Sequence, residues 1–392
     1  MKLKLFFIFC FLFFSFFYST YAYVNIDSCQ EINSSFSFDA SRKVILNTSI
    51  ITTIASTESC ILLNAENMSF SCDGYGNYIL GNASGSGIRA IGKNISLSNC
   101  LISNFTYNVF SNNILFNFTS SVSTYGKGDG FYGAVSTLGT NASVKNVNVT
   151  FSLWDGFFAY NSHYSNFNNI IIHSSFQSGL YISGTQNSIF SNIYSYNNSF
   201  LGIRFNLASN NILFNSKSYN NNNSGLHIMW GSNNNQIYNN YIYNNSLYEI
   251  EFYEFIAPPI NNIFYGNIIG DSTSIYSNNW PNTPNFFNNS NYGNIYLDFN
   301  YSSCGISSYV NNSCTYNFCN GANVTINGAN NIVDMIPLIN MSGITCNLEY
   351  PAVTLILSNG SSSGSASSFY PVGGSISLII GFVILFGFFI FA

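Results

Sequence analysis

Charged side chains are scarce in this sequence. Only 6% of its 392 residues are Asp, Glu, Lys or Arg, with 10 basic against 15 acidic residues and a net charge of −5. Proteins that bind nucleic acids carry a basic patch or stripe, so we expect no nucleic-acid partner. Histidine is rare as well, and the scatter of His163, His173 and His227 along the chain predicts no metal site. We also expect no cofactor.

A helical repeat of apolar residues is missing from the centre of the chain. Between Thr140 and Phe255, apolar residues never recur for long at the i, i+3, i+4, i+7 spacing of a helix. Short runs rich in Ile, Val, Tyr and Phe, such as Ile170–His173 and Ile203–Asn206, alternate instead with Asn, Ser and Gly. Such runs between turn-forming residues are typical of strands.

These short runs recur with a period of 23 residues. Two markers keep this spacing: Gly156, Gly179, Gly202 and Gly225, and, ten residues before each, Asn146, Asn169, Asn192 and Asn215. A fifth copy is shifted by one residue, with Asn239 and then Glu249 in place of Gly. Codon bias explains abundant Asn but not this register. A period of 20–50 residues indicates stacked units.

The length of the repeat favours one kind of stacked unit. A propeller blade needs about 40 residues, whereas two or three short strands in 23 residues suit one coil of a parallel β-helix, with coils about 4.8 Å apart. We expect an all-β fold with a parallel β-helix over residues 23–300. The repeated Asn would form a ladder inside a turn, and the repeated Gly would supply the positive φ of a sharp corner. Residues 107–140 interrupt the period and predict an insertion between coils.

The chain resembles a known family in its opening lines as well as in its repeat. The stretches that carry the resemblance are Cys60–Gly76, Gly87–Arg89 and Lys93–Phe105, together with the 23-residue repeat. They resemble right-handed parallel β-helix repeat proteins, a group that includes pectate lyases and the copper-site maturation protein of nitrous-oxide reductase, and most of all the archaeal-type cell-surface members. The resemblance implies a right-handed coil and carries over no copper ligands. It says little about function, because this fold hosts lyases, hydrolases, adhesins and binding proteins.

Cysteine is absent from the 203 residues between Cys100 and Cys304. Apart from Cys10, eight cysteines remain, four early and four late: Cys29, Cys60, Cys72, Cys100, Cys304, Cys314, Cys319 and Cys346. An even number in an exported chain predicts disulfides, so we expect a bridged cap at each end, with the pairing open. A zinc site at Cys314 and Cys319 is the alternative, but no His lies nearby.

Long apolar runs occur only at the two ends of the chain. Residues 1–22 have the charge, apolar core and small residues of a secretory signal, with an uncleaved anchor as the alternative. Residues 301–357 are expected to be a Cys-rich cap or small β module, and 358–371 a Ser/Gly linker. Residues 372–392 carry no charge and are long enough for a transmembrane helix, with a buried core helix as the alternative. The chain also has about eighteen Asn-x-Ser/Thr sites, a number that abundant Asn and Ser produce by chance as well.

The repeat also predicts which side chains point outward, because side chains alternate along a strand. Residues one and three after each Gly are uniformly apolar and should face inward: Phe157, Leu180, Ile203, Leu226 and Ile250, with Ala159, Ile182, Phe205, Ile228 and Phe252. The residues two after each Gly should form an exposed column: Phe158, Tyr181, Arg204, His227 and Glu251. A second exposed face would carry Tyr194, Tyr196, Lys217, Tyr219, Tyr241 and Tyr243, next to His173.

This column is the candidate ligand site, and three interpretations stay open. It can be a surface charge ladder worth under about 1 kcal/mol per ion pair, a groove that binds sugar chains through Tyr rings and directional hydrogen bonds, or a catalytic face. A lyase needs a basic residue such as Arg204, beside calcium ligands that are missing here. A hydrolase needs two carboxylates that flank the bond, and Asp155 stands apart from Glu249, Glu251 and Glu254.

The sequence as a whole indicates a surface protein. We expect a body outside the cell, anchored in the cell membrane by its C-terminal segment, with a structural or adhesive role and with glycans or envelope proteins as partners. A polysaccharide lyase or glycoside hydrolase is the alternative, and a passive component of an S-layer-like coat is a third option. We name no catalytic residue, and whether the protein is an enzyme stays open, with a non-enzymatic role favoured.

Overall fold

The computed structural model describes residues 24–33, 43–72, 77–112, 116–124, 135–254, 257–270, 275–277, 285–288, 293–297, 305–311, 314–320, 324–325 and 333–334. All of them belong to the first of two units, residues 1–345. The expected signal 1–22, linker 358–371 and anchor 372–392 lie outside the described residues. Within the described ranges, no helix is both long enough and apolar enough to span a membrane.

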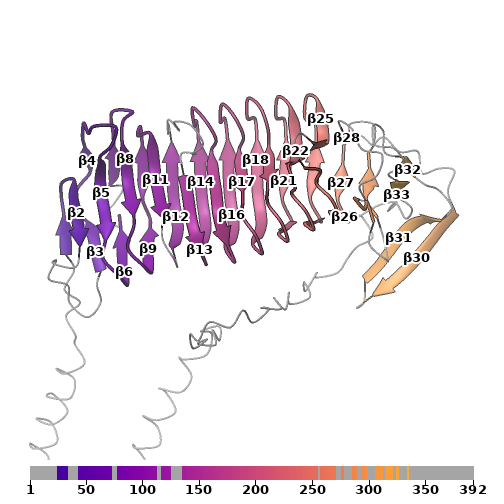
Figure 1. Ribbon diagram of the computed structural model, residues 1–392, viewed down its shortest axis with the longest axis horizontal. Coiled ribbons are helices and arrows are strands. Elements are labelled where there is room, and N and C mark those ends of the chain that lie inside the picture. The colour runs from indigo at the N-terminus through magenta and orange to yellow at the C-terminus, as the bar shows by residue number, and fades with distance from the viewer. Residues whose placement is uncertain are drawn as a thin grey trace, which may run out of the picture. The chain divides into compact units, whose positions relative to one another are not determined.

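Most described strands belong to two long parallel sheets that share the same coils, so that strands of successive coils lie side by side (Figure 1). Sheet B has 11 strands: β2 (Gln30–Asn33), β5 (Ser59–Asn64), β8 (Ser86–Ala90), β11 (Tyr107–Asn112), β13 (Val135–Thr140), β15 (Phe157–His163), β17 (Leu180–Ser183), β19 (Ile203–Asn206), β22 (Ser224–Met229), β25 (Tyr248–Tyr253) and β28 (Ile275–Ser277).

Sheet A has 18 strands. They are β1 (Val24–Ile26), β3 (Lys43–Leu46), β4 (Ile50–Ile51), β6 (Met68–Ser71), β7 (Tyr78–Leu80), β9 (Ile95–Ser98), β10 (Leu101–Ser103), β12 (Asn117–Thr124), β14 (Ser143–Thr150), β16 (Asn166–His173), β18 (Ile189–Tyr196), β20 (Ile212–Phe214), β21 (Lys217–Tyr219), β23 (Gln236–Tyr238), β24 (Tyr241–Tyr243), β26 (Ile263–Tyr265), β27 (Ile268–Ile269) and β29 (Ile295–Tyr296).

The expected insertion within residues 107–140 falls largely on residues 125–134, which lie outside the described residues. β11, β12 and β13 continue the coils before and after it, and Val109 pairs with Ile88 on one side and Val135 on the other. The strand ladder therefore continues through the described residues on both sides of this irregular stretch. Two antiparallel pairs follow later in the chain: β30 (Gly305–Asn311) with β31 (Cys314–Asn320), and β32 (Val324–Thr325) with β33 (Val333–Asp334).

The core fills the inside of the coils. The two predicted inward columns are confirmed, because all ten of their side chains are buried. Rings also stack along the axis, as in Phe167 and Phe190, whose centroids lie 4.6 Å apart with a 4° angle between ring planes. Burial of each such side chain contributes about 1.5–3 kcal/mol relative to leaving it in water, which makes the repeated apolar columns the main source of stability.

The repeated Asn residues lie at corners and do not form the internal ladder that the sequence predicts. Asn169, Asn192 and Asn215 have φ of 53°, 53° and 51°, and Asn tolerates this left-handed conformation better than most residues. The prediction of an internal ladder was wrong for these residues, because the left-handed turn directs them outward. Each of these Asn residues bends a strand or lies between two strands, as Asn215 does between β20 and β21. Sheet A is thereby divided into two parts that meet at a bend.

Internal ladders do exist, but other Asn residues form them. Asn211 Nδ2 donates to Asn235 Oδ1 at 3.2 Å, Asn235 Nδ2 to Asn262 Oδ1 at 2.9 Å, and Asn262 Nδ2 to Asn285 Oδ1 at 2.9 Å. Backbone N–H groups donate to the same oxygens, for example Asn235 N to Asn262 Oδ1 at 3.0 Å. These side chains are buried, so the ladder satisfies polar groups that the coil interior would otherwise leave unbonded.

The repeated Gly residues are needed for space and not for φ, which corrects the second expectation about the repeat. Positive φ occurs at other glycines, among them Gly184 and Gly231. A Cβ at Gly202 would instead run into the side-chain oxygen of Ser218. That hydroxyl donates to Gly225 O at 2.6 Å. The glycine column therefore leaves room for inward side chains: the Ser195 and Ser218 hydroxyl groups at Gly179 and Gly202, Ile172 at Gly156 and Asn245 at Gly225.

Two disulfides bridge the early coils, Cys29–Cys60 and Cys72–Cys100, with Cα atoms 4.4 Å and 4.8 Å apart. The prediction that these four cysteines form disulfides is confirmed, and the structure supplies the pairing that the sequence left open. Cys304 and Cys346 lie outside the described residues, as do the side chains of Cys314 and Cys319.

Candidate functional site

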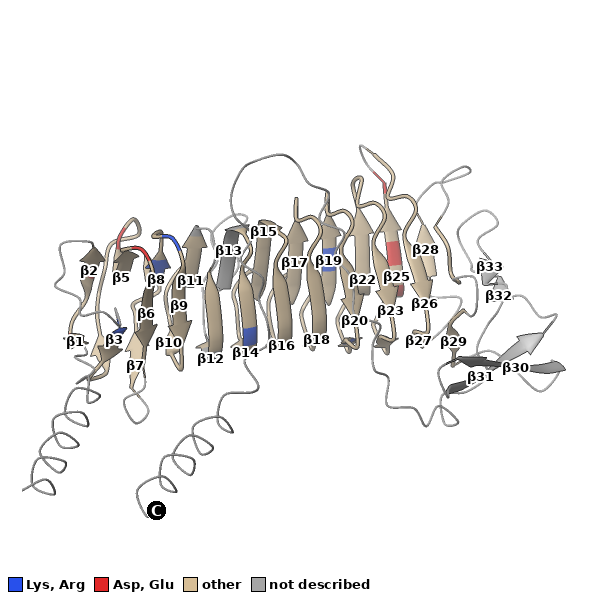
Figure 2. Cartoon of the chain, turned by 90° about the horizontal axis from the view of Figure 1, so that it is seen from below, with Lys and Arg blue, Asp and Glu red and all other residues tan. Residues whose placement is uncertain are grey.

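The predicted column lies on the outer face of sheet B and is longer than expected. The paired residues run without a break along all 11 strands: Glu31, Leu62, Arg89, Phe110, Ser136, Phe158, Tyr181, Arg204, His227, Glu251 and Tyr276. We call this the outer column. Its register confirms the side-chain alternation used to predict it. In Figure 2 a blue segment lies on β19 and a red segment lies on β25, on strands that are otherwise mostly tan.

The expectation that this column is exposed is wrong for its aromatic members. Phe158, Tyr181 and His227 are only 1%, 5% and 8% exposed, whereas Arg204 and Glu251 are half-buried. Strands in a sheet lie about 4.8 Å apart, so large side chains at equivalent positions cover one another. The Phe158 and Tyr181 rings lie 4.9 Å apart, and Arg204 Cζ lies 4.4 Å from the Tyr181 ring centre.

Arg204 is held in place from several sides. Its guanidinium group lies over the Tyr181 ring, a cation–π contact, and its Nε donates to Met229 Sδ at 3.3 Å. The Tyr181 hydroxyl accepts a hydrogen bond of 2.7 Å from Asn206 Nδ2. Tyr181 is buried, and its ring is covered by Phe158 and Arg204, so it offers a ligand no free ring face. Arg204 is the member through which this part of the column reaches solvent.

His227 and Glu251 form the polar end of this cluster. His227 Nδ1 lies 3.0 Å from Glu251 Oε2, and the Ser224 hydroxyl donates to the same oxygen at 2.5 Å. Burial raises the pKa of Glu251, but the nearby His227 and Ser224 lower it more, so that the net pKa lies below the usual value. Within the described residues, His227 Nε2 is buried and has no hydrogen-bond partner.

Asp155 is a buried carboxylate at the edge of the same face, directly before the repeated Gly156 and β15. Its Oδ1 accepts a hydrogen bond from Ser178 N at 2.9 Å. Burial raises the pKa of Asp155 to about 6, although the hydrogen bonds from Ser178 and the charge of Arg204 act in the opposite direction. Asp155 is thus linked electrostatically to Arg204, a relation that the sequence did not indicate.

Asp155 and Glu251 cannot act together as a hydrolase pair. They lie four strands apart along sheet B, from β15 through β17, β19 and β22 to β25, which is about 19 Å at about 4.8 Å per coil. Glycosidase carboxylates are about 5–9.5 Å apart. Glu249 does not help, because it is buried and accepts a hydrogen bond of 2.6 Å from Asn245 Nδ2.

The tyrosines of sheet A form a stacked ladder. The rings of His173, Tyr196, Tyr219 and Tyr243 lie 4.9, 5.0 and 5.3 Å apart, with angles of 20°, 9° and 3° between ring planes. Lys217 Nζ lies between Tyr194 and Tyr241, at 5.8 and 5.3 Å from their ring centres. Because the ring faces cover one another, they do not offer flat faces to a sugar.

Exposed apolar side chains line the turn that leads into sheet B. Leu153, Phe176, Phe200 and Leu247 are 59%, 61%, 41% and 51% exposed. Each stands two or three residues before the repeated Gly or its Glu249 replacement, so the repeat contained the signal, but the sequence analysis did not use it. We call these four residues the rim. It provides apolar contact area beside the outer column that the tyrosine ladder does not.

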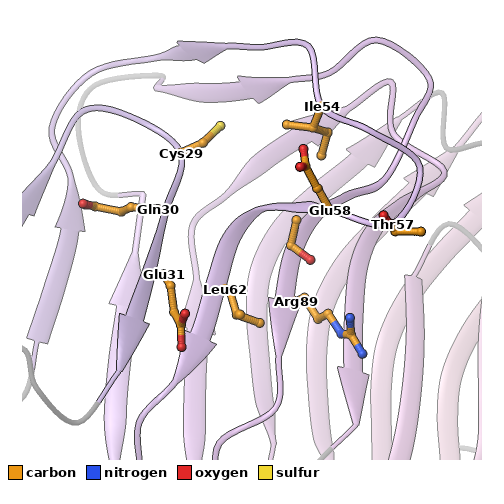
Figure 3. A pocket seen from close by; sticks show the side chains of 9 residues that line it. Cys29, Gln30, Glu31, Ile54, Thr57, Glu58, Leu62 and Arg89 are labelled. Atoms are coloured by element: carbon orange, nitrogen blue, oxygen red, sulfur yellow. The ribbon is translucent and has the colours of Figure 1, made fainter.

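A hollow of about 340 Å³ lies at the N-terminal end of the same face (Figure 3). Its nine lining residues are Cys29, Gln30, Glu31, Ile54, Thr57, Glu58, Ser59, Leu62 and Arg89. Three of them, Glu31, Leu62 and Arg89, belong to the outer column. The repeat period does not reveal this site, because it lies before the regular repeat. No group of three or more His, Cys, Asp or Glu side chains that could hold a metal occurs among the described residues.

Comparison with known proteins agrees with this architecture. The family model for a right-handed β-helix region matches residues 132–314. This chain is a right-handed parallel β-helix protein. A search of curated proteins finds no match.

Two solved structures show the same fold at low sequence identity. The β-helix superimposes on the Dettilon tailspike protein with a TM-score of 0.55 and 16% identity, over 76% of this chain and 68% of that one. For the A-module of the Azotobacter vinelandii mannuronan C-5 epimerase AlgE6, the TM-score is 0.50 with 15% identity, over 66% and 84% of the two chains. At these identities the likeness shows the fold alone.

Proposed function

We propose that this β-helix protein is displayed outside the cell and binds an extended saccharide along the outer face of sheet B. The observation that carries the proposal is the cluster of Arg204, His227 and Glu251 on three successive strands. In a chain with so few charges, a cation, an imidazole and a carboxylate at neighbouring positions make this the most polar part of the repeat.

The chemistry of the cluster suits sugar hydroxyl groups. Glu251 accepts hydrogen bonds, Arg204 donates them, and both are half-buried and so within reach of a ligand. Phe176 and Phe200 are exposed rings in the turns that lead into β17 and β19, and they would supply apolar contact. Buried Tyr181 and His227 position these groups and do not themselves meet the ligand. The mannuronan epimerase among the similar structures is a sugar-acting protein by its name, which makes saccharides the first ligands to test.

The location of this face is part of the proposal. The expected secretory signal 1–22 would send the β-helix across the membrane, and the expected anchor 372–392 would keep it at the surface. Disulfides at Cys29–Cys60 and Cys72–Cys100 fit an oxidising compartment. A structural or adhesive role follows, with glycans of the envelope as partners.

A glycan array probed with the purified full chain tests this proposal. We expect binding to extended saccharides that falls at least tenfold in Arg204→Gln and in Glu251→Gln. Lys145→Gln is the matched control, since Lys145 is an exposed charge on β14 of sheet A. Equal loss in the control, or no glycan bound by the wild type, contradicts the proposal and leaves a surface charge ladder as the better interpretation.

A lyase-type activity is the second candidate, because Arg204 is a half-buried basic residue on a face that stays partly open to solvent. Incubation with uronate polymers, followed by ultraviolet detection of unsaturated sugars, tests it. We expect no product from the wild type if the protein only binds, whereas product that disappears in Arg204→Gln would assign the protein to the enzymes.

A further inference from the structure

We propose that the hollow between β2, β5 and β8 binds a single sugar unit that carries no acidic group. The inference deepens the proposed function and rests on it in part, because Glu31, Leu62 and Arg89 lie on the outer column that also carries Arg204 and Glu251. Its evidence is separate, however, since the hollow lies five strands before β19 in sheet B.

The size of the hollow fits a small polar ligand. Its volume of about 340 Å³ is at the lower end of the range of small-molecule sites. Figure 3 shows the lining side chains contributed by separate strands and by the turn before β5, so the site forms only in the folded coil. Ile54 and Leu62 give it an apolar part, while Gln30, Thr57 and Ser59 add polar groups.

Arg89 is the one cation among the lining residues, and it has an unused donor. Its Cζ lies 5.5 Å from the centre of the Phe110 ring, which positions the guanidinium group. Its Nε is buried and, among the described residues, has no hydrogen-bond partner. A buried donor without a partner is destabilising, and buried polar groups are nearly always bonded. A ligand in the hollow would meet the guanidinium charge, and its acceptor atom would bond this Nε once the Arg89 side chain turns toward it.

The two carboxylates of the hollow supply acceptors. Asn64 Nδ2 donates to Glu31 Oε1 at 3.0 Å, and Ala55 N donates to Glu58 Oε2 at 3.1 Å. Glu31 Oε2 and Glu58 Oε1 are therefore left to accept hydrogen bonds from a ligand, as judged from the described residues. A sugar ring fits this set, because each of its hydroxyl groups can both donate to a carboxylate and accept from Arg89.

The charge balance selects against acidic sugars. Glu31 and Glu58 together outweigh the single charge of Arg89, so the lining of the hollow is net negative. A uronate would meet two like charges in a partly buried site, where charges interact more strongly than in water. A neutral sugar meets no such penalty, and an amino sugar would gain attraction. The hollow therefore differs in preference from the region around Arg204.

Titration calorimetry on the purified full chain tests the inference, with glucose, galactose, glucosamine and glucuronic acid as probes. We expect saturable binding of at least one neutral or amino sugar, at least tenfold tighter than glucuronic acid. Arg89→Gln and Glu58→Gln should each weaken it at least tenfold, whereas Lys93→Gln, which removes an exposed charge next to β9, should not.

Three results would overturn the inference: no saturable binding of any of the four sugars, undiminished binding in Arg89→Gln, or tighter binding of glucuronic acid than of glucose. A thermal melt checks the fold of each variant. If Arg89→Gln fails to fold, Glu58→Gln decides. Monosaccharide binding that depends on Arg89, without any array signal that depends on Arg204, would reject the proposed function and keep this inference, and the reverse pattern would do the opposite.

Discussion

Asp155 is fully buried at the start of β15, although it is a charged residue at neutral pH in most settings. Its pKa of about 6 lies above the 3.8 of an exposed Asp because burial disfavours the charged form. The native state therefore binds a proton more tightly than the unfolded chain, and the free energy of unfolding falls as the pH rises from about 4 to about 6. Above about pH 6, the contribution of Asp155 to the free energy of unfolding no longer changes with pH.

Replacing Asp155 with Asn should remove this dependence on pH. Between pH 4 and pH 7, we expect the free energy of unfolding of Asp155→Asn to rise relative to wild type by about 3 kcal/mol, which corresponds to a shift of about two pKa units. Urea denaturation of both proteins at each pH gives the difference and cancels the contribution of other groups. A difference that stays constant with pH would show that Asp155 is not buried as described.

Two kinds of glycine should respond differently to replacement by Ala. At Gly202 a Cβ would meet the Ser218 hydroxyl and the Gly225 carbonyl oxygen, so we expect a loss of at least about 2 kcal/mol from overpacking. Gly231 has a φ of +67°, and a Cβ there would make only ordinary contacts of 3.7 Å with Ala257 and Leu207, so the left-handed conformation alone should cost about 1–2 kcal/mol. Thermal unfolding compares the two, and a smaller loss at Gly202 than at Gly231 would contradict our account of the repeat.

At the scale of elements, the internal Asn ladders tie each coil to the next. Asn235 shows how many bonds one member makes: its Oδ1 accepts from Asn211 N and Nδ2, and its Nδ2 donates to Ala208 O and Asn262 Oδ1. Removing this side chain leaves several buried groups unbonded at once. Each such unbonded group costs about 1–3 kcal/mol. Substitution at a ladder position should therefore destabilise the protein far more than substitution of an exposed polar residue.

We expect Asn235→Ala to lower the free energy of unfolding by at least about 3 kcal/mol. The neighbouring residue offers a matched control, because Asn234 is exposed with a φ of 57° and contributes no ladder bond. Asn234→Ala should cost about 1 kcal/mol, from the left-handed backbone. Chemical denaturation measures both variants. Similar losses for the two would mean that the ladder is not the tie between coils.

At the scale of the whole molecule, the two disulfides hold the least regular coils. Paired residues of β2 and β5 are 31 positions apart, as in Gln30 and Ile61, and those of β5 and β8 are 27 apart, as in Ile61 and Ile88. Longer coils carry more loop, and each crosslink reduces the entropy of the unfolded chain. The bridges therefore compensate for a start of the β-helix that lacks the tight 23-residue repeat.

Mass spectrometry without reduction should find peptides that link Cys29 to Cys60 and Cys72 to Cys100. Reduction should lower the stability of this end by about 2–4 kcal/mol per bridge, which hydrogen exchange would show as faster exchange in β2, β5 and β8 than in β17 and β19. Free thiols at these four positions in the protein isolated from its host would contradict the described pairing.

The sequence by itself determined the strands of the central coils, the inward columns and the register of the outer column. A fixed period stacks equivalent residues, and side-chain alternation then decides which of them face the core. Both rules depend only on spacing along the sequence, so they apply without knowledge of the tertiary structure. The resemblance added the handedness, and the even number of cysteines indicated disulfides without their partners.

Only the tertiary structure decided how the outward residues are covered and which distant residues meet. Tyr181 and His227 are buried because neighbouring coils place large side chains about 4.8 Å away, and that depends on side-chain packing between coils. Gly202 makes room for Ser218. Sequence spacing alone does not show which side chain lies opposite a given backbone position, so this contact could not be predicted. The hollow beside Arg89 joins residues from coils of unequal length, which no fixed period can align.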